Sequence, residues 1–196
     1  KDKENTSDVK FIDSKFQNIS NGFCFSKNHV PTNFEIKNCT FNSNIDQAKK
    51  YSSLSLTERA EKRKSVPSSC FKLSLSAIEV SNSIFFECNK LDLFDVGFTK
   101  LSIDKCKFSD SAVGIFTGHS NSNCSIEDCE FEKSDFHRSY FLSFYNITQL
   151  NANKIRFNSI GSQFNPIKLD RIINCTFTEC KFNKCESSSS PVSIRI

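Results

Sequence analysis

Residues 36–41 read Ile36-Lys37-Asn38-Cys39-Thr40-Phe41: an apolar residue, two polar residues, a small residue, one more polar residue and phenylalanine. Variants of this phrase recur along the chain, and the step from Phe85 to Phe108 is 23 residues. A period in this range is typical of stacked supersecondary units, because one such unit cannot bury its apolar face alone. The copies end at Phe16, Phe41, Phe85, Phe108, Phe131, Phe157 and Phe177.

Within one period the apolar residues alternate as they do in strands, and not at helical spacing. We expect three short strands per period, for example around residues 91–93, 101–103 and 106–108. Three short strands per turn of about 23 residues describe a parallel β-helix. The sequence therefore predicts an all-β parallel β-helix solenoid of about 7–8 coils, with residues 1–196 as a single domain.

The residue just before the small residue of each phrase predicts a corner between two strands. Asn and Asp tolerate left-handed backbone and suit such a tight bend. A continuous strand would not need them there. The predicted corner residues are Asp13, Asn38, Asn82, Lys105, Asp128, Lys154 and Asn174.

The small position of the phrase holds cysteine in four copies and serine or isoleucine in the others. Such a position requires a compact inward side chain, and free cysteine behaves in this way. Disulfides stay open as an alternative, because adjacent coils place Cα atoms about 4.8 Å apart. The ten cysteines contain no Cys-x-x-Cys pair, so we expect neither zinc nor another cofactor. Beside the phenylalanines, the predicted core positions are Cys39, Cys106, Cys129 and Cys175.

Charged residues support the stacking register. Residues one period apart become neighbours across the sheet, and opposite charges in such pairs contribute a few tenths of a kcal/mol each. The pair of Asp104 and Glu127 breaks the alternation of sign. The alternating rows are Lys105-Asp128-Lys154 at the corner and Lys107-Glu130-Arg156 on the outward face of the third strand.

The composition excludes several classes of protein. The hydrophobic fraction is 37%, and the 21 phenylalanines argue against a disordered chain. No apolar run is long enough to span a membrane. We expect this stretch to be an excerpt of a longer protein, with any export signal or anchor outside it. The net charge is +4 without a basic stripe among exposed aromatics, so we expect no nucleic-acid partner.

Residues 46–69 do not fit the period. The step of 44 residues from Phe41 to Phe85 is either two coils of 22 residues or one coil that contains this segment as an insertion. The segment is polar and basic, and Ser55 followed by Glu58 resembles a capping box, which predicts a short helix. The simplest interpretation is a solvated excursion on a long turn. The alternative is a contact element for a partner, formed by Lys62, Arg63 and Lys64.

Coils ending in Asn-Cys-Thr-Phe, at residues 38–41 and 174–177, resemble the right-handed parallel β-helix, or pectin-lyase-like, superfamily. The resemblance covers nearly all of residues 9–185 and implies a right-handed coil. Other phrases are similar to the FxxN repeats of polymorphic outer-membrane proteins and related surface proteins, although their glycine-rich GGAI motif is missing. These phrases stand at residues 41–44 and, more loosely, 16–19 and 157–160.

Many members of the superfamily act on acidic polysaccharides. Polygalacturonase-like members carry an Asp-Asp pair, and this chain has none, although paired carboxylates are needed for acid–base work at a glycosidic bond. Gly118-His119-Ser120 and Arg195-Ile196 are only echoes of their other motifs. We therefore assign no catalytic residue and lean against an enzyme. The alternative is a polysaccharide-processing enzyme, pectin lyase- or glycosidase-like, with catalytic coils partly outside this stretch.

Six Asn-x-Ser/Thr sequons allow N-glycosylation, and two of them, at Asn38 and Asn174, coincide with predicted corners. We expect a non-catalytic segment of an extracellular or cell-surface glycoprotein with a membrane-anchored parent. It would serve as an adhesion or interaction platform, or as a rigid spacer, and its partner would be a glycan or protein on a cell surface. It would be monomeric or part of a larger chain. The candidate glycan sites are Asn123, Asn146, Asn18 and Asn5.

Overall fold

The chain forms a parallel β-solenoid in the computed structural model. Every pair of neighbouring strands is parallel, and no helix occurs among the described residues. The predicted fold class is therefore confirmed. The structure describes residues 7–17, 23–24, 31–42, 69–86, 92–109, 113–136, 142–162, 167–183 and 192–195.

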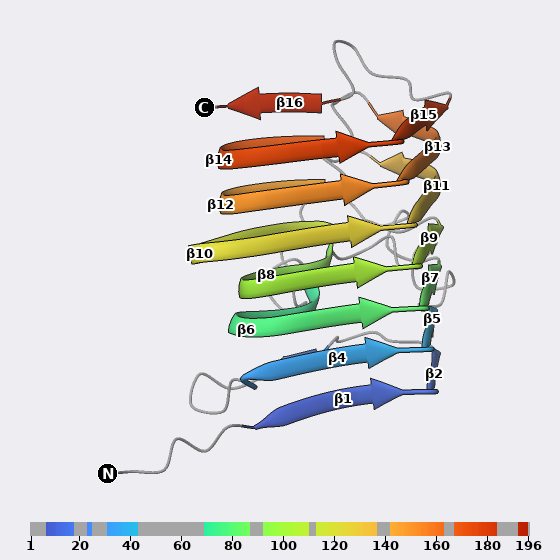
Figure 1. Cartoon of the computed structure of the whole chain (residues 1–196). Helices are drawn as coiled ribbons and strands as arrows, with labels where there is room; N and C mark the ends of the chain where they lie inside the picture. The colour runs from blue at the N-terminus through green and yellow to red at the C-terminus, as the bar shows by residue number, and fades with distance from the viewer. Residues whose placement is uncertain are drawn as a thin grey trace, which may run out of the picture.

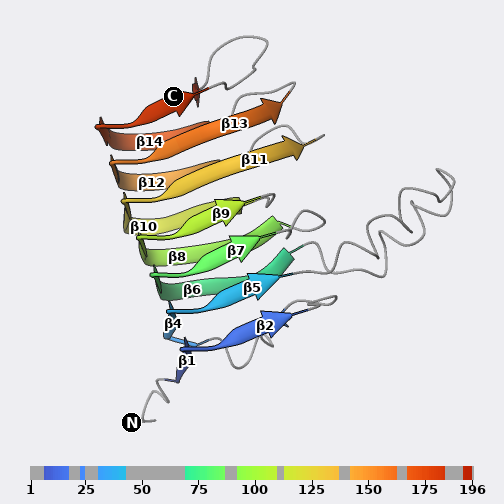
Figure 2. The ribbon, with the colours of Figure 1, turned by 90° about the vertical axis from the view of Figure 1, so that its right-hand side faces the viewer.

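Two sheets run side by side along the stack (Figures 1 and 2). The first sheet contains β1 (Asp8–Ile12), β3 (Phe23–Cys24), β4 (Asn33–Lys37), β6 (Ser69–Ser81), β8 (Asp92–Asp104), β10 (Gly114–Glu127), β12 (Leu142–Asn153), β14 (Ile167–Thr178) and β16 (Val192–Arg195). The second sheet contains β2 (Lys15–Gln17), β5 (Thr40–Asn42), β7 (Ile84–Phe86), β9 (Lys107–Ser109), β11 (Glu130–Phe136), β13 (Arg156–Ser162) and β15 (Lys181–Asn183).

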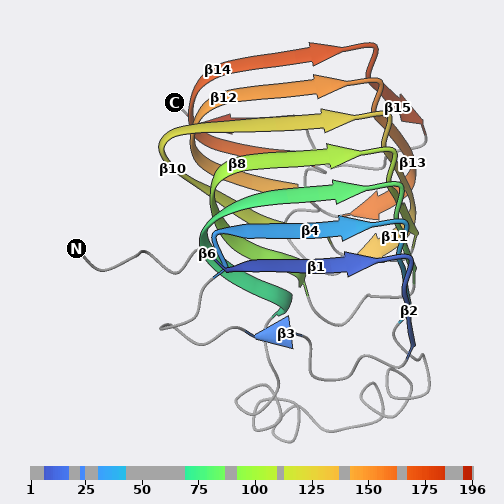
Figure 3. The same ribbon diagram turned by 60° about the horizontal axis from the view of Figure 1, so that its bottom comes forward.

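The long strands of the first sheet combine two of the three strands predicted for each period. Figure 3 shows β6 and β10 curving back on themselves, where the sequence predicts a turn between two strands. The pairing of β10 with β12 shifts register between Thr117 and Asn123, and Asn121 within this interval has a left-handed φ of 60°. Asn146 in β12 has a φ of 54°. The expected turn is thus a bend inside one strand, and it uses the same left-handed backbone as the corner.

The corner predicted from the phrase is present in each rung. Six of the predicted residues have φ between 48° and 54°, although lysine has no special tolerance for this conformation. The N–H of a corner residue donates to a carbonyl of the next rung, as from Asn38 to Ser81 at 3.1 Å. The backbone donor at the bend is therefore satisfied. The six residues are Asp13, Asn38, Asn82, Lys105, Asp128 and Lys154.

The small residue after the corner is a hydrogen-bond donor as well as a compact side chain. The Ser83 hydroxyl donates to the Ser81 carbonyl at 2.8 Å, and the Cys129 thiol donates to the Glu127 carbonyl at 3.1 Å. Both bonds span the corner, from the small residue to the carbonyl two positions earlier. This geometry explains why Ser and Cys replace one another there, while Ile155 supplies only the packing.

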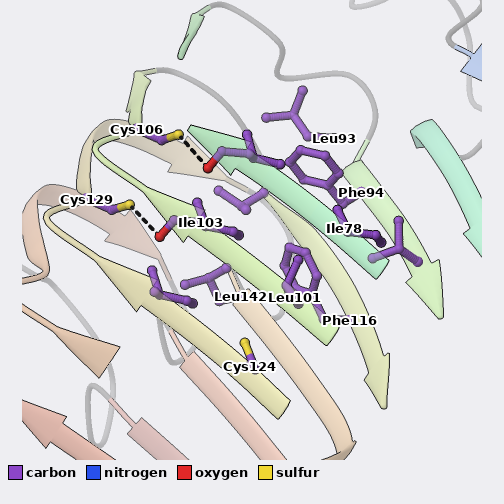
Figure 4. Packing of buried hydrophobic residues seen from close by; sticks show 14 of the residues in the cluster. Ile78, Leu93, Phe94, Leu101, Ile103, Cys106, Phe116, Cys124, Cys129 and Leu142 are labelled. Atoms are coloured by element: carbon purple, nitrogen blue, oxygen red, sulfur yellow. Dashed lines mark hydrogen bonds between the residues drawn. The ribbon is translucent and has the colours of Figure 1, made fainter. Parts of the chain in front are cut away.

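The cysteines whose side chains are described are free thiols. Cys39, Cys106 and Cys129 are buried, and Figure 4 shows the Cys129 thiol directed at the Ile103 carbonyl of the preceding rung, 3.7 Å away. The side-chain hydrogen bond with Cys106, together with burial, raises the pKa of Cys129. Buried thiols with raised pKa values are unreactive at neutral pH.

The phenylalanines at the end of the phrase form one continuous stack of rings inside the solenoid. Ring centroids of successive members lie 4.6 to 5.0 Å apart, and the ring planes differ by 3° to 13°. The middle members are fully buried. The stack consists of Phe16, Phe41, Phe85, Phe108, Phe131, Phe157 and Phe182.

The last copy of the phrase lies five residues later than the sequence predicts, so the assignment of residues 172–177 to it is wrong. Phe157 is the register partner of Phe182, whereas Phe177 is the partner of Ala152 on the long strand β12. Phe177 is 37% exposed. The physical reason is that β14 continues to Thr178 and keeps pairing with β12, which delays the corner.

Three neighbouring assignments change with this shift. The corner residue is Glu179, with φ of 54°, and not Asn174. The small position is taken by Cys180, whose thiol donates to the Thr178 carbonyl at 3.5 Å. Cys175, predicted in the core, is exposed on β14.

The long step from Phe41 to Phe85 is a single rung, because these two phenylalanines are register partners on β5 and β7. Of the segment 46–69, only Ser69 at the start of β6 belongs to the described residues. The predicted helix and contact element therefore lie outside the part of the chain that the structure describes.

Candidate functional site

The second sheet is the one nearer the viewer in Figure 2, and its outward face carries one row in which most residues are charged. Its residues alternate along each strand with the buried small residue and phenylalanine, so their side chains point away from the core. Parallel pairing places them in register from one rung to the next. In order along the stack, the row is Lys15, Thr40, Ile84, Lys107, Glu130, Arg156 and Lys181.

The middle of this row is electrically compensated. Lys107 Nζ lies 3.4 Å from Glu130 Oε2 and also contacts Glu132. The hydrogen bond to Glu132, helped by the charge of Glu130, raises the pKa of Lys107. Asn158 Nδ2 donates to Glu130 Oε1 at 2.9 Å. Lys107 and Glu130 are thus paired, as the alternation of charge in the sequence predicts.

The end of the row is different, because Arg156 has Glu130 as its register partner on one side but Lys181 on the other. Like charges directly opposite one another destabilise a sheet. Within the described ranges, neither side chain takes part in an ion pair. The two cations therefore leave a local excess of positive charge.

The like-charged pair that the sequence predicts, Asp104 and Glu127, has compensation. Asp104 and Glu127 are register partners on β8 and β10. Lys105 Nζ lies 3.1 Å from Asp104 Oδ2, and this hydrogen bond raises the pKa of Lys105. Asn153 Nδ2 donates to Glu127 Oε1 at 3.1 Å. Each carboxylate therefore has a side-chain partner of its own, whereas Arg156 and Lys181 have no ion pair within the described ranges.

A hollow of about 550 Å³ lies beside the two cations at the corner of the last rungs. Three of its lining residues are cationic and one is a carboxylate, so its charge is positive. Guanidinium and ammonium groups gathered in this way suit a carboxylate, sulfate or phosphate group. The cationic hollow is lined by Lys154, Arg156, Glu179, Cys180 and Lys181.

Of the residues that line the cationic hollow, the sequence predicts the positions of Lys154 and Arg156 only. A signal for them is present, since residues 180–182 repeat the letters Cys-Lys-Phe of residues 106–108. That match places Lys181 in the outward row and Glu179 at the corner.

The predicted glycan sites in the described region are exposed. Asn123 and Asn146 lie in β10 and β12 and not in turns, although Asn146 occupies the bend of its strand. His119 is also exposed on β10. The remaining candidates lie outside the described residues: Asn5, Asn18, Lys62, Arg63 and Lys64.

The described residues bring together no three side chains of His, Cys, Asp or Glu that could hold a metal ion. No helix found in them is long and apolar enough to cross a membrane.

No protein-family model, curated protein or solved structure matches the chain. The resemblance to pectin-lyase-like and FxxN surface proteins therefore depends on the phrases quoted from the sequence.

Proposed function

We propose that the chain is a non-catalytic interaction platform of a surface or secreted protein, and that the cationic hollow binds an anionic group of its partner. The observation that carries this proposal is the like-charged register pair of Arg156 and Lys181, neither of which takes part in an ion pair within the described ranges. The FxxN-like phrases support a place among surface proteins, and the exposed sequons at Asn123 and Asn146 agree with it.

The charge pattern supports a ligand at this position. A like-charged pair across two strands costs a few tenths of a kcal/mol. Asp104 and Glu127 avoid that cost through Lys105 and Asn153. An anion bound in the hollow would reduce the repulsion between Arg156 and Lys181 in the same way.

The chemistry of the two cations favours an oxyanion. Arg156 offers planar donors that can hold two oxygens of a carboxylate, sulfate or phosphate, and Lys181 adds a mobile point charge. Neighbouring strands are about 4.8 Å apart, so both side chains can reach one oxyanion group. We therefore expect a sulfated or carboxylated glycan as the partner.

The stack supports binding by holding the cations in place. Arg156 and Lys181 each precede a ring of the phenylalanine stack, and these two rings lie 4.9 Å apart and nearly parallel. Backbone that is already ordered loses little entropy when a ligand binds.

Binding to immobilised sulfated and carboxylated glycans, with a neutral glycan beside them, tests the proposal. The double variant Arg156→Gln/Lys181→Gln should bind roughly tenfold more weakly, because it removes two charged hydrogen-bond donors. Added salt should also weaken binding by the unchanged chain.

The matched control is Lys10→Gln/Lys72→Gln. It removes the same total charge from two lysines that already lie 2.9 and 3.6 Å from carboxylates. Equal losses of glycan affinity in the two double variants would mean that the chain attracts the glycan through its net charge alone. That result would refute the hollow as the binding site. Absence of binding to every glycan would favour the rigid spacer. Shortened glycan chains in the recovered sample would favour the polysaccharide-processing enzyme instead.

A further inference from the structure

The outward face of the first sheet changes character along the stack. One row of register partners on this face begins with Lys10, Glu35 and Glu79. Lys10 Nζ and Glu35 Oε2 form an ion pair of 2.9 Å. Beyond β6 the same row holds only neutral hydroxyl and amide groups. In order along the stack, these are Ser102, Ser125, Asn151 and Thr176.

A second neutral row lies beside the first on β10, β12 and β14. Its members are register partners and stand two residues earlier in each strand. Neighbours are about 4.8 Å apart from rung to rung, and the two rows are about 6.6 Å apart along the strands. Figure 1 shows the three strands stacked nearly parallel, so both rows are straight. We call these six residues the polar face: Asn123, Ser125, Gln149, Asn151, Asn174 and Thr176.

The polar face lies on the flank of the stack. The strands β10 and β12 are each paired with a neighbour on both sides, and yet their four residues in the polar face are exposed. Between these residues, Cys124 and Leu150 point inward and are buried. The exposure of the polar face therefore comes from the outward side of the sheet and does not depend on what adjoins β14.

The side chains of the polar face do not bond to one another, in contrast to other amides on neighbouring rungs. Asn183 Nδ2 donates to Asn158 Oδ1 at 2.9 Å, and Asn153 Nδ2 donates to Glu127 Oε1 at 3.1 Å. Within the part of the chain that the structure describes, none of the six side chains takes part in a hydrogen bond or an ion pair. Their donors and acceptors are therefore available to a ligand.

The chemistry of the polar face selects the kind of partner. Nucleic acids and acidic glycans need cations, and none of the six residues is charged. Protein partners depend on aromatic or arginine anchors and lipid surfaces on apolar side chains, and the polar face has neither. Amides and hydroxyls both donate and accept hydrogen bonds, as the hydroxyl groups of a sugar do.

We propose that the polar face binds an extended, uncharged polysaccharide through its hydroxyl groups. The straight rows of side chains fit an extended sugar chain better than a coiled one. The strands beneath are already ordered, so binding costs little backbone entropy. Each new hydrogen bond replaces one to water, so its net gain is small and several bonds act together. This site goes beyond the proposed function and does not rest on it, because no residue of the cationic hollow belongs to the polar face.

Depletion of the full, unglycosylated chain from solution by microcrystalline cellulose tests the inference. Cellulose is an extended, uncharged glucan, and amylose beads provide a coiled one for comparison. We expect cellulose to retain more of the chain than amylose does. The double variant Gln149→Ala/Asn151→Ala should bind cellulose roughly tenfold more weakly, because each lost hydrogen bond lowers affinity roughly threefold to tenfold.

The matched control is Gln17→Ala/Asn183→Ala, which removes the same two residue types from exposed positions on the second sheet. We expect it to bind cellulose as the unchanged chain does. All four substitutions are on exposed side chains, so both variants should fold, and circular dichroism checks this. Equal losses of cellulose affinity in the two variants would overturn the proposal. Equal retention by cellulose and amylose, or no binding to either, would overturn it too.

Salt separates this site from the cationic hollow. Added salt and the double variant Arg156→Gln/Lys181→Gln should leave binding to cellulose unchanged, whereas both should weaken binding to an acidic glycan. Cellulose binding that falls in either experiment would place the contact at the hollow and refute the polar face. An N-glycan found on Asn123 or Asn174 of the secreted protein would cover the polar face, and this result would also refute it.

Discussion

Replacement of Phe108 by alanine measures how much the phenylalanine stack contributes to stability. The ring is 0% exposed, and its centroid lies 4.9 Å from that of Phe85 and 5.0 Å from that of Phe131. Truncation of a buried phenylalanine to alanine costs about 3–5 kcal/mol. Because aromatic contacts on both sides add about 0.5–1.5 kcal/mol each, we expect a loss near the upper end of that range.

Urea unfolding followed by far-UV circular dichroism gives the free energy of unfolding for this comparison. Phe177→Ala is the matched control, because the same side chain is removed at a position that is 37% exposed. We expect the control to cost no more than about 2 kcal/mol. A loss below about 1 kcal/mol for Phe108→Ala would show that the stacked ring is not part of the stable core.

Two smaller perturbations test other parts of the fold. Lys105→Asn should raise the free energy of unfolding by about 0.5 kcal/mol, because asparagine tolerates the left-handed corner better than lysine and this gain exceeds the loss of the exposed ion pair with Asp104; an unchanged or lower urea midpoint would contradict this explanation of the corner. For Cys175, partial desolvation of an otherwise exposed thiol raises the pKa from about 9 to about 11. The thiolate is the reactive form, and its fraction increases as the pH rises towards the pKa. The rate of alkylation by iodoacetamide, measured by mass spectrometry, should therefore increase up to about pH 11. A plateau near pH 9 would show that the thiol is not desolvated.

The sequence predicts the corners and the stack well, because both depend on contacts that repeat in every rung. A residue such as Lys105 has no preference for left-handed backbone, yet its place before Cys106 identifies it as a corner. The hydrogen bond from the small residue to the carbonyl across the corner could not be predicted. It depends on the side-chain orientation at the corner, where Ser83 and Cys129 donate in the same way.

The sequence does not predict the cationic hollow, because it places the last copy of the phrase five residues too early. Residues 174–177 repeat the letters of residues 38–41, although their phenylalanine follows Phe157 by only 20 residues. With that placement the neighbour of Arg156 is Thr176, and the like-charged pair with Lys181 does not exist. The pairing of β14 with β12 fixes the correct register through contacts that the local phrase does not contain.

The hydrogen bonds from each corner to the next rung also determine how such a chain can lengthen or shorten in evolution. Lys105 N–H donates to the Glu127 carbonyl at 3.0 Å, and Asp128 N–H donates to the Asn153 carbonyl at 3.1 Å. Deletion of residues 106–128 would join Lys105 to Cys129 and present its N–H to Asn153, so every donor would find an equivalent acceptor. Duplication or loss of a whole period thus preserves the stack, whereas a single residue inserted into the phrase would shift every contact of its rung.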